Sequence, residues 1–159
     1  MSEEKDTLPE GWVTAKVAEI SDVVEPGFPY GKYNTVGLGF PQLRPMNIDS
    51  QGRLCFDEVK YADLKNPPLL LSGDILFNNT NSSVWVGKTT VIPEDNKFTF
   101  SNHMTRVRLN SHAGLPTFYA MQLHYLQQSG YFQARCNHHV NQASISSSYL
   151  SSNVDLLVH

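Results

Sequence analysis

The stretch NPPLLLSGDILFNNTNSS, residues 66–83, joins a turn, an apolar run and a run of small polar residues. Asn66-Pro67-Pro68 is typical of a turn, because proline fixes its own backbone angle and cannot donate a backbone hydrogen bond. The apolar run that follows predicts a strand over about residues 74–79. Beyond it, the residues from Asn78 to Ser83 carry amide and hydroxyl groups that can form hydrogen bonds with base edges. The stretch therefore predicts a strand with polar side chains at its far end.

Similar apolar runs, rich in β-branched and aromatic residues, lie on both sides of this stretch. A long loop is expected after Pro26, where proline and glycine are frequent. The runs predict strands over residues 12–17 and around residues 33–40, 54–61, 84–92 and 98–109.

Helical patterns are expected mainly near the end of the chain. From Leu115 to Leu126 the apolar residues recur at helical spacing, which predicts a helix that begins near Pro116 and ends at Gly130. Shorter helical segments are predicted over residues 18–24, 131–136 and 144–150, with Ser144 as the cap of the last. The predicted fold class is α+β: a single mixed domain with a twisted, mainly antiparallel sheet and a few short helices in the C-terminal third.

The composition is that of a globular protein, with 159 residues, 40% hydrophobic residues and 17% charged residues. We expect one domain over residues 1–159, with a loose tail over residues 1–8. No apolar run approaches the ~18 residues of a membrane span, and the acidic start does not resemble a signal peptide. These features favour a cytoplasmic protein without a membrane segment. Two cysteines exclude a disulfide framework.

The net charge of −3 argues against nucleic acid as a partner, but the charges are unevenly distributed. Residues 1–25 contain seven acidic residues and two lysines, whereas residues 96–154 contain four basic residues and no acidic one. Residues 26–48 and 75–93 also lack Asp and Glu. The chain can therefore present a mildly basic face to phosphate, although an ordinary surface with uneven charge fits the composition equally well.

Several chemical interpretations fail on the residues themselves. Asn-Pro-Pro followed by an aromatic is the catalytic motif of adenine methyltransferases, but Leu69 offers no face for stacking a flipped base. Gly87-Lys88-Thr89 lacks the upstream glycine of a phosphate-binding loop, because Ser82 stands there. Cys136, His138 and His139 could supply metal ligands only with distant residues that the sequence does not identify. We therefore expect no catalytic residue, no metal and no cofactor.

Amide and basic residues at turns remain as candidates for binding. In the segment 101–108 polar and apolar residues alternate, so that Met104 and Arg106 share one strand face with Asn102. Asn141 and Gln142 lie just before a predicted helix start. Amides suit adenine edges, and Arg and Lys suit guanine edges or phosphates.

Taken in order, these segments resemble the target recognition domain of the specificity subunit in type I restriction–modification systems. The matching elements are Leu8-Pro9-Glu10-Gly11-Trp12, Arg44-Pro45-Met46-Asn47-Ile48, the run from Ser72 to Ser82 with Val86-Gly87-Lys88, Phe100-Ser101-Asn102-His103 with Arg106 and Arg108, and the run from Val140 to Ser146. The resemblance covers about residues 8–158. Asn79 departs from it, because many relatives have Arg at this position.

The resemblance implies a non-catalytic module that reads one half of a bipartite target in double-stranded DNA. A modification subunit would supply adenine methylation, and a restriction subunit would supply cleavage. The chain would be the N-terminal recognition domain, ending before the conserved helical spacer. Its expected DNA-binding residues are Lys32, Tyr33, Asn34, Arg44, Asn47, Asn79, Thr80, Asn81, Ser82, Lys88, Asn102, His103, Arg106, Asn141 and Gln142.

Within this set we expect two kinds of residue. The motif residues Arg44, Lys88, His103 and Arg106 would hold the DNA backbone or the fold, because relatives that read different sequences share them. Base readers would lie chiefly in the loop 28–34 and at the variable positions Asn79, Thr80 and Ser83. Among them, Lys32 and Asn79 have the donors to discriminate guanine or adenine edges. An adenine methyltransferase fragment and a plain structural adaptor are the alternatives. The first would bind a methyl-donor cofactor, and the second would bind neither cofactor nor DNA.

Overall fold

The computed structural model describes residues 7–159, so that residues 1–6 of the expected tail lie outside the described part. The described residues form twelve strands, two α-helices and two short 3-10 helices, η1 (Val17–Glu19) and η2 (Pro45–Asn47). The strands belong to four small sheets, and most pairs are antiparallel. The mixed α+β class, with its helices in the C-terminal third, is confirmed.

The central sheet contains four strands in the order β2-β9-β5-β7. Their bounds are Ser21–Pro26, Met104–Leu109, Ile75–Asn78 and Thr89–Val91 respectively. Along β5, Ile75 and Phe77 enter one apolar cluster, whereas Leu76 enters a second. Successive residues of a strand point to opposite faces, so both faces of β5 are covered by protein. This double burial explains why the strand reads as a continuous apolar run.

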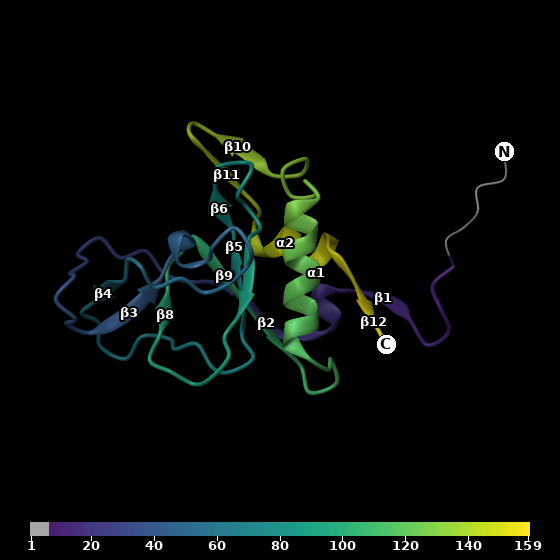
Figure 1. Ribbon diagram of the computed structural model, residues 1–159, viewed down its shortest axis with the longest axis horizontal. Coiled ribbons are helices and arrows are strands. Elements are labelled where there is room, and N and C mark those ends of the chain that lie inside the picture. Colours follow the sequence, from purple (N-terminus) through teal and green to yellow (C-terminus); the bar gives the residue numbers. More distant parts are fainter. Residues whose placement is uncertain (1–6) are drawn as a thin grey trace.

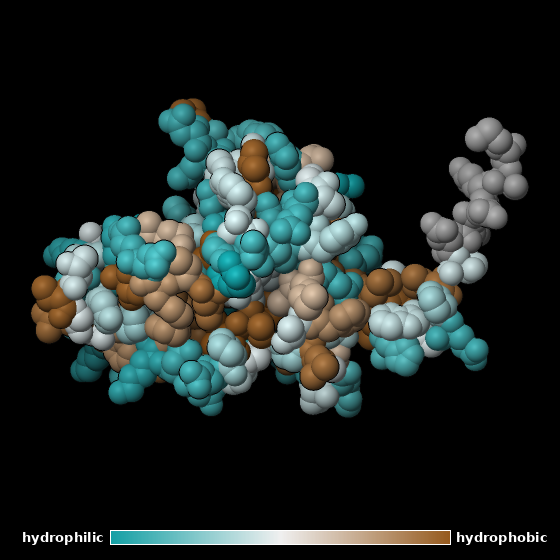
Figure 2. Space-filling view, in the orientation of Figure 1, coloured by the Kyte–Doolittle hydropathy of each residue, from teal (hydrophilic) through white to brown (hydrophobic). Residues whose placement is uncertain are grey.

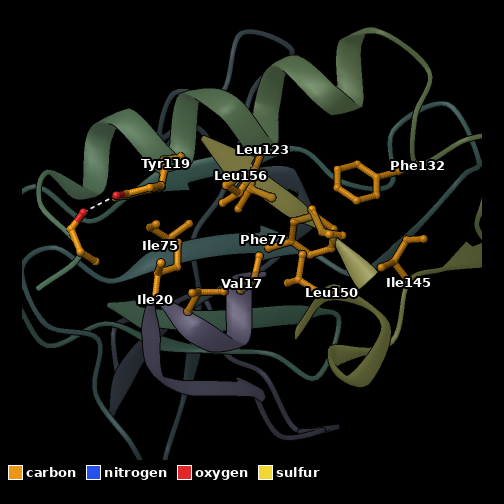
Figure 3. Packing of buried hydrophobic residues seen from close by; sticks show 14 of the residues in the cluster. Val17, Ile20, Ile75, Phe77, Tyr119, Leu123, Phe132, Ile145, Leu150 and Leu156 are labelled. Carbon is orange, nitrogen blue, oxygen red and sulfur yellow. Dashed lines mark hydrogen bonds between the residues drawn. The ribbon is translucent and has the colours of Figure 1, made fainter. Parts of the chain in front are cut away.

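Helix α1 (Pro116–Gln128) covers one face of the central sheet, and the main core lies between them (Figures 1 and 3). In this core the rings of Phe77 and Phe132 meet edge to face, with their centroids 5.0 Å apart. Leu123 comes from α1 and Leu150 from α2 (Ser147–Asn153). At the start of α1, the Tyr119 hydroxyl donates to the carbonyl of Ala113 (Figure 3). The strands β1 (Val13–Lys16) and β12 (Asp155–Val158) pair beside α1.

The second cluster lies on the other face of β5, under a lobe of three strands. These are β4 (Lys60–Ala62), β3 (Phe40–Leu43) and β8 (Thr99–Phe100), in the sheet order β4-β3-β8. The pair β3–β8 is parallel. Figure 1 shows this lobe on the opposite side of the central sheet from α1.

A third sheet forms a projection from the molecule. Strands β10 (Asn137–His139) and β11 (Gln142–Ser144) make a hairpin, and β11 also pairs with β6 (Thr80–Asn81). The hairpin rises at the top of Figure 1, and Figure 2 shows it as hydrophilic with a hydrophobic tip. Val140, between the two strands, is 91% exposed.

The predicted helix over 116–130 and the strands over 12–17 and 74–79 are confirmed, as is the loop after Pro26. The other strand predictions are only partly right. The region around 33–40 is a loop until Phe40, and the run 54–61 becomes a strand only at Lys60. Residues 84–88 form a turn before β7, and residues 101–103 form a turn that separates β8 from β9.

Two predicted helices are wrong, and a third begins later than predicted. Residues 18–24 contain only the end of η1 and then join the sheet, because β2 pairs with β9. Residues 131–136 form successive turns. Ser144 lies in β11, so the final helix begins later, at Ser147, and Ser146 caps it by accepting from the backbone amide of Tyr149 at 3.0 Å. Among the described residues, no helix is long and apolar enough to cross a membrane.

Candidate nucleic-acid interface

Three of the predicted basic residues come together at one hollow of about 410 Å³. Arg44 precedes η2, Lys88 precedes β7 and His103 precedes β9. The full lining is Arg44, Pro45, Met46, Ser50, Asn81, Trp85, Lys88 and His103. Segments that are far apart in the sequence therefore build one concave surface.

A second hollow of about 340 Å³ shares Arg44 and His103 with the first, so the two adjoin. Its remaining lining comes from the loop after β2 and the turn between β8 and β9, and consists of Pro29, Tyr30, Gly31, Tyr33, Ser101 and Asn102. The guanidinium carbon of Arg44 lies over the Tyr33 ring, 4.9 Å from its centroid. The Tyr33 hydroxyl donates to Gln42 at 2.7 Å, which fixes the ring beneath Arg44.

Neither hollow has a carboxylate in its lining. With the exception of Ser50, all lining residues come from the three acid-free segments 26–48, 75–93 and 96–154. A concave surface with cations and no acidic group concentrates positive potential and favours an anionic ligand. We refer to these two joined hollows as the basic groove.

His103 lies in the groove close to Arg44. Burial is the main cause that lowers the pKa of His103 below its ordinary value, and the positive charge of Arg44 lowers it further. At neutral pH His103 is therefore an uncharged imidazole, which can donate one hydrogen bond and accept another. An uncharged His103 can contact a ligand through hydrogen bonds but not through charge.

Lys88 is buried, and its ammonium group holds the segment around η2. Nζ donates to the carbonyl of Pro45 at 3.0 Å and also to the carbonyl of Ile48. Burial lowers the pKa of Lys88 from its ordinary value. Next to it, Gly87 has a φ of +97°, and a Cβ there would lie 2.4 Å from the Phe132 ring. The Gly-Lys pair therefore closes a tight turn and supports the floor of the groove.

Arg106 is buried inside the protein rather than in the groove. One of its nitrogens donates to the carbonyl of Leu69 at 3.1 Å, and another pairs with Glu25. The guanidinium carbon lies over the Phe100 ring, 5.2 Å from the centroid. Of the two roles expected for Arg106, these contacts support the role in the fold.

The amide of Asn79 also belongs to the interior, which revises the expectation that it reads a base. Its Nδ2 donates to the carbonyl of Asn102 at 3.1 Å and to the hydroxyl of Thr105 at 2.9 Å, and its Oδ1 accepts from Thr80 at 2.7 Å. Both donors are thus engaged within the protein. Thr80 is partly buried, and its hydroxyl is the donor to Asn79.

Two further predicted residues hold loops. Asn47 is buried, and its Nδ2 donates to the carbonyls of Cys55 and Glu58, both at 3.0 Å. Asn34 donates to the carbonyl of Leu38 at 2.9 Å and accepts from the amide of the same residue at 3.0 Å. Such local bonds are usual for asparagine in loops. Neither residue lines the groove.

The remaining predicted residues lie at the surface. Lys32 is exposed in the loop beside Tyr33, and Asn102 is exposed in the second hollow. Asn81 lines the first hollow while its Nδ2 donates to Asn78 at 2.7 Å, and Ser82 is exposed next to it. Asn141 and Gln142 are exposed on the β10–β11 hairpin. This hairpin is attached to the rest of the protein through the pairing of β11 with β6.

Two large apolar residues of the groove, Trp85 and Met46, were not among the predicted DNA-binding residues. Both are large and apolar, yet they are 42% and 45% exposed. Apolar residues in predicted strands are usually assigned to the core, and only the turn at 84–88 brings Trp85 to the surface. In residues 7–159, no group of three or more His, Cys, Asp or Glu side chains could hold a metal ion.

Comparison with known sequences gives one informative relative. The chain is 26% identical over 149 residues to a protein of Methanocaldococcus jannaschii that is named as the specificity subunit of the type I restriction enzyme MjaX. The match covers 90% of this chain and 35% of the relative. The chain thus spans about a third of the length of the curated relative it matches. No protein-family model matches the sequence.

Solved structures agree in fold. A chain from a study of complex assembly and conformational transition in a type I restriction–modification system superposes with a TM-score of 0.70, at 17% identity, over 99% of this chain and 36% of that chain. The HsdS subunit of Thermoanaerobacter tengcongensis gives 0.65 at 18% identity, over 98% of this chain and 35% of the subunit. The S subunit from M. genitalium gives 0.63 at 14% identity, over 95% of this chain and 36% of the subunit.

These values are consistent with a single domain of those longer chains, and the sequence relative agrees with the motifs recognised above. In sequence and in fold, this chain is similar to one domain of a type I restriction enzyme specificity subunit.

Proposed function

We propose that this chain recognises one half of a bipartite target in double-stranded DNA, in the cytoplasm, and thereby directs a partner adenine methyltransferase and a restriction subunit. The observation that carries the proposal is the basic groove, which has Arg44 and His103 at its centre and no carboxylate in its lining. The similarity to specificity subunits supports the same function. Lys32 and Asn102 would read base edges at the rim of the groove, because both are exposed.

The chain itself is proposed to be non-catalytic. Leu69 occupies the position where a methyltransferase needs an aromatic residue, and its carbonyl accepts from Arg106. The segment after Asn66 therefore has a structural contact and no face for a flipped base. Calorimetric titration with S-adenosylmethionine should give no binding heat, whereas saturable binding at micromolar concentration would favour the methyltransferase alternative.

The direct test is the selection of bound sequences from a pool of random duplexes, with this chain and its modification subunit together. We expect enrichment of one short half-site, and the modification subunit alone should give none. The same selection with Arg44→Ala should recover fewer molecules of the same half-site. Recovery without any sequence preference would contradict the recognition function and favour a structural adaptor.

A further inference from the structure

Trp85 stands between two hollows of the surface. It lines the basic groove, and it also lines a neighbouring hollow of about 380 Å³. This neighbouring hollow has no charged residue in its lining, and the amides of Gln127, Gln128 and Gln133 contribute to it. An exposed indole at this position forms a planar apolar ridge between a basic and an amide-rich surface.

The backbone around Trp85 is held firmly. Its amide donates to the carbonyl of Ser82 at 3.0 Å, and its carbonyl accepts from the amide of Lys88 at 3.3 Å. On either side of Trp85, Gln127 donates to the carbonyl of Val84 at 2.8 Å and Val86 is buried. When a ligand covers the indole, the backbone is therefore already ordered, and only the two side-chain torsions remain to be fixed.

The surroundings of the indole favour a nucleic acid as the ligand. The ammonium group of Lys88 lies over the indole ring, 5.8 Å from its centroid, and Arg44 and Met46 line the same hollow. Cations beside an exposed aromatic ring are an arrangement in which proteins hold the phosphates and stack the bases of unpaired nucleotides. An apolar side chain at such a site can also wedge between base steps of a duplex.

We propose that Trp85 is a DNA-contacting residue that packs its indole against a base, while Arg44 positions the neighbouring phosphate. This inference rests on the proposed function and adds to it a stacking residue that the sequence motifs do not include. Base stacking on an aromatic ring predicts a loss of affinity of about 5- to 150-fold when the ring is removed.

The test uses intrinsic fluorescence, because Trp12 and Trp85 are the two tryptophans of the chain. In a Trp12→Phe variant, Trp85 is the single reporter. Adding a short duplex of random sequence at low salt should quench its emission and shield it from acrylamide. The midpoint should match that of the anisotropy of the same duplex carrying a fluorescent label. In the matched Trp85→Phe variant, the emission of Trp12 should not respond to DNA.

Substitutions then separate stacking from simple packing. Trp85→Leu should lose about tenfold in affinity, and Trp85→Phe should retain most of it, because only phenylalanine keeps a planar ring. Tyr125→Ala removes an aromatic residue that is 68% exposed on α1, outside the groove, and should have no effect. The Trp85→Phe variant also guards against misfolding, since it preserves the ring.

The outcomes distinguish this inference from the proposed function. If the anisotropy of the duplex does not change at low salt even when the modification subunit is present, the proposed function is wrong and the inference fails with it. If the duplex binds but Trp85 emission and the Trp85→Leu affinity stay unchanged, only the inference is wrong. A response of Trp85 to the modification subunit in place of DNA would assign the residue to a protein interface and would likewise overturn the inference.

Discussion

Arg108 binds the carboxylate of Asp74 through two donors, with Nε 2.7 Å from Oδ1 and Nη2 2.8 Å from Oδ2. Asp74 is almost fully buried, and its Oδ2 also accepts from the amide of Leu71 at 2.8 Å. One side chain thus joins the start of β5, the turn before it and the neighbouring strand β9. The Gly-Asp element of the opening stretch therefore has a structural purpose.

We predict that Asp74→Asn lowers the free energy of unfolding by about 2–4 kcal/mol, because it leaves the Arg108 guanidinium without its charge partner. The estimate allows for the 31% exposure of the Arg108 side chain. Urea denaturation measures the change. The control is Asp155→Asn, which breaks the exposed Lys16–Asp155 pair and should have a much smaller effect, because solvent screens that pair. Equal effects of the two substitutions would contradict this assignment.

The second prediction concerns phosphate contacts. The isolated chain should bind DNA weakly, because few cations line the groove. Arg44→Ala should reduce the slope of log K against log salt by about 1, with little change in unfolding free energy. Lys16→Ala makes the same charge change at the β1–β12 pair and should leave the slope unchanged. Nanomolar binding by the isolated chain at physiological salt would show that more phosphates are contacted than this surface predicts.

The third prediction separates Lys32 from Asn79. Lys32→Ala should relax the preference at one base position, at a cost of about 1–3 kcal/mol for the preferred base, and should leave the stability unchanged. Asn79→Ala should instead lower the free energy of unfolding by about 1–3 kcal/mol, because the hydrogen bonds to Asn102 and Thr105 are lost. Sequence selection measures the base preference of both variants, and urea denaturation measures their free energy of unfolding. If a folded Asn79→Ala protein showed a changed base preference, Asn79 would be a base-contacting residue after all, and this prediction would be wrong.

The fourth prediction concerns pH. His124 Nδ1 accepts from the amide of Thr89 at 3.2 Å, so that the proton resides on Nε2, which lies 3.3 Å from the carbonyl of Ser50. Burial lowers the pKa of His124 below its ordinary value, and the nearby Lys88 lowers it further, whereas the hydrogen bond to Ser50 and the charge of Asp49 raise it.

Because the pKa of His124 is lower in the folded state than in the unfolded state, the unfolded chain binds the proton first as the pH falls. The contribution of neutral His124 to the free energy of unfolding should therefore be fully present above about pH 6.5. It should decrease as the pH falls from there toward the folded pKa of His124. His124→Asn keeps an acceptor for Thr89 but does not titrate, and it should show a smaller loss between neutral and mildly acidic pH. His103 also has a lowered pKa and is present in both proteins, so it does not affect the comparison. Identical pH profiles would exclude His124 as a source of the effect.

The parts of the fold that the sequence predicted are those with a strong local pattern. Helix α1 has apolar residues at helical spacing between Pro116 and Gly130, and β5 has an apolar run between two turns. The wrong segments are those in which a distant partner decides the structure. In the segment 18–24, the residues from Ser21 onward pair with β9. In the segment 131–136, the Phe132 ring packs against Gly87, and the backbone forms successive turns.

The candidate site shows the same limit. Arg44, Lys88 and His103 come from three separate motifs of the sequence, and only the structure shows that they line one hollow. An asparagine in a turn, however, can bond either to the backbone or to a ligand, and the two uses have the same sequence pattern. Asn34, Asn47 and Asn79 all proved to bond within the protein, whereas Asn102 is exposed. Trp85 was missed because a turn, and not a strand, carries it.

The antiparallel pair of β1 and β12 places Val13 opposite Val158. Figure 1 shows this pair beside α1, on the side away from the lobe of β3, β4 and β8. A short peptide linker could therefore close the described chain into a ring without disturbing the groove, and new ends could be opened in the exposed turn at Ser111 and His112, before α1. Such a circular permutant, or a host protein that accepts the whole unit in one of its loops, should keep the same DNA preference, because the recognition surface does not depend on where the polypeptide is cut.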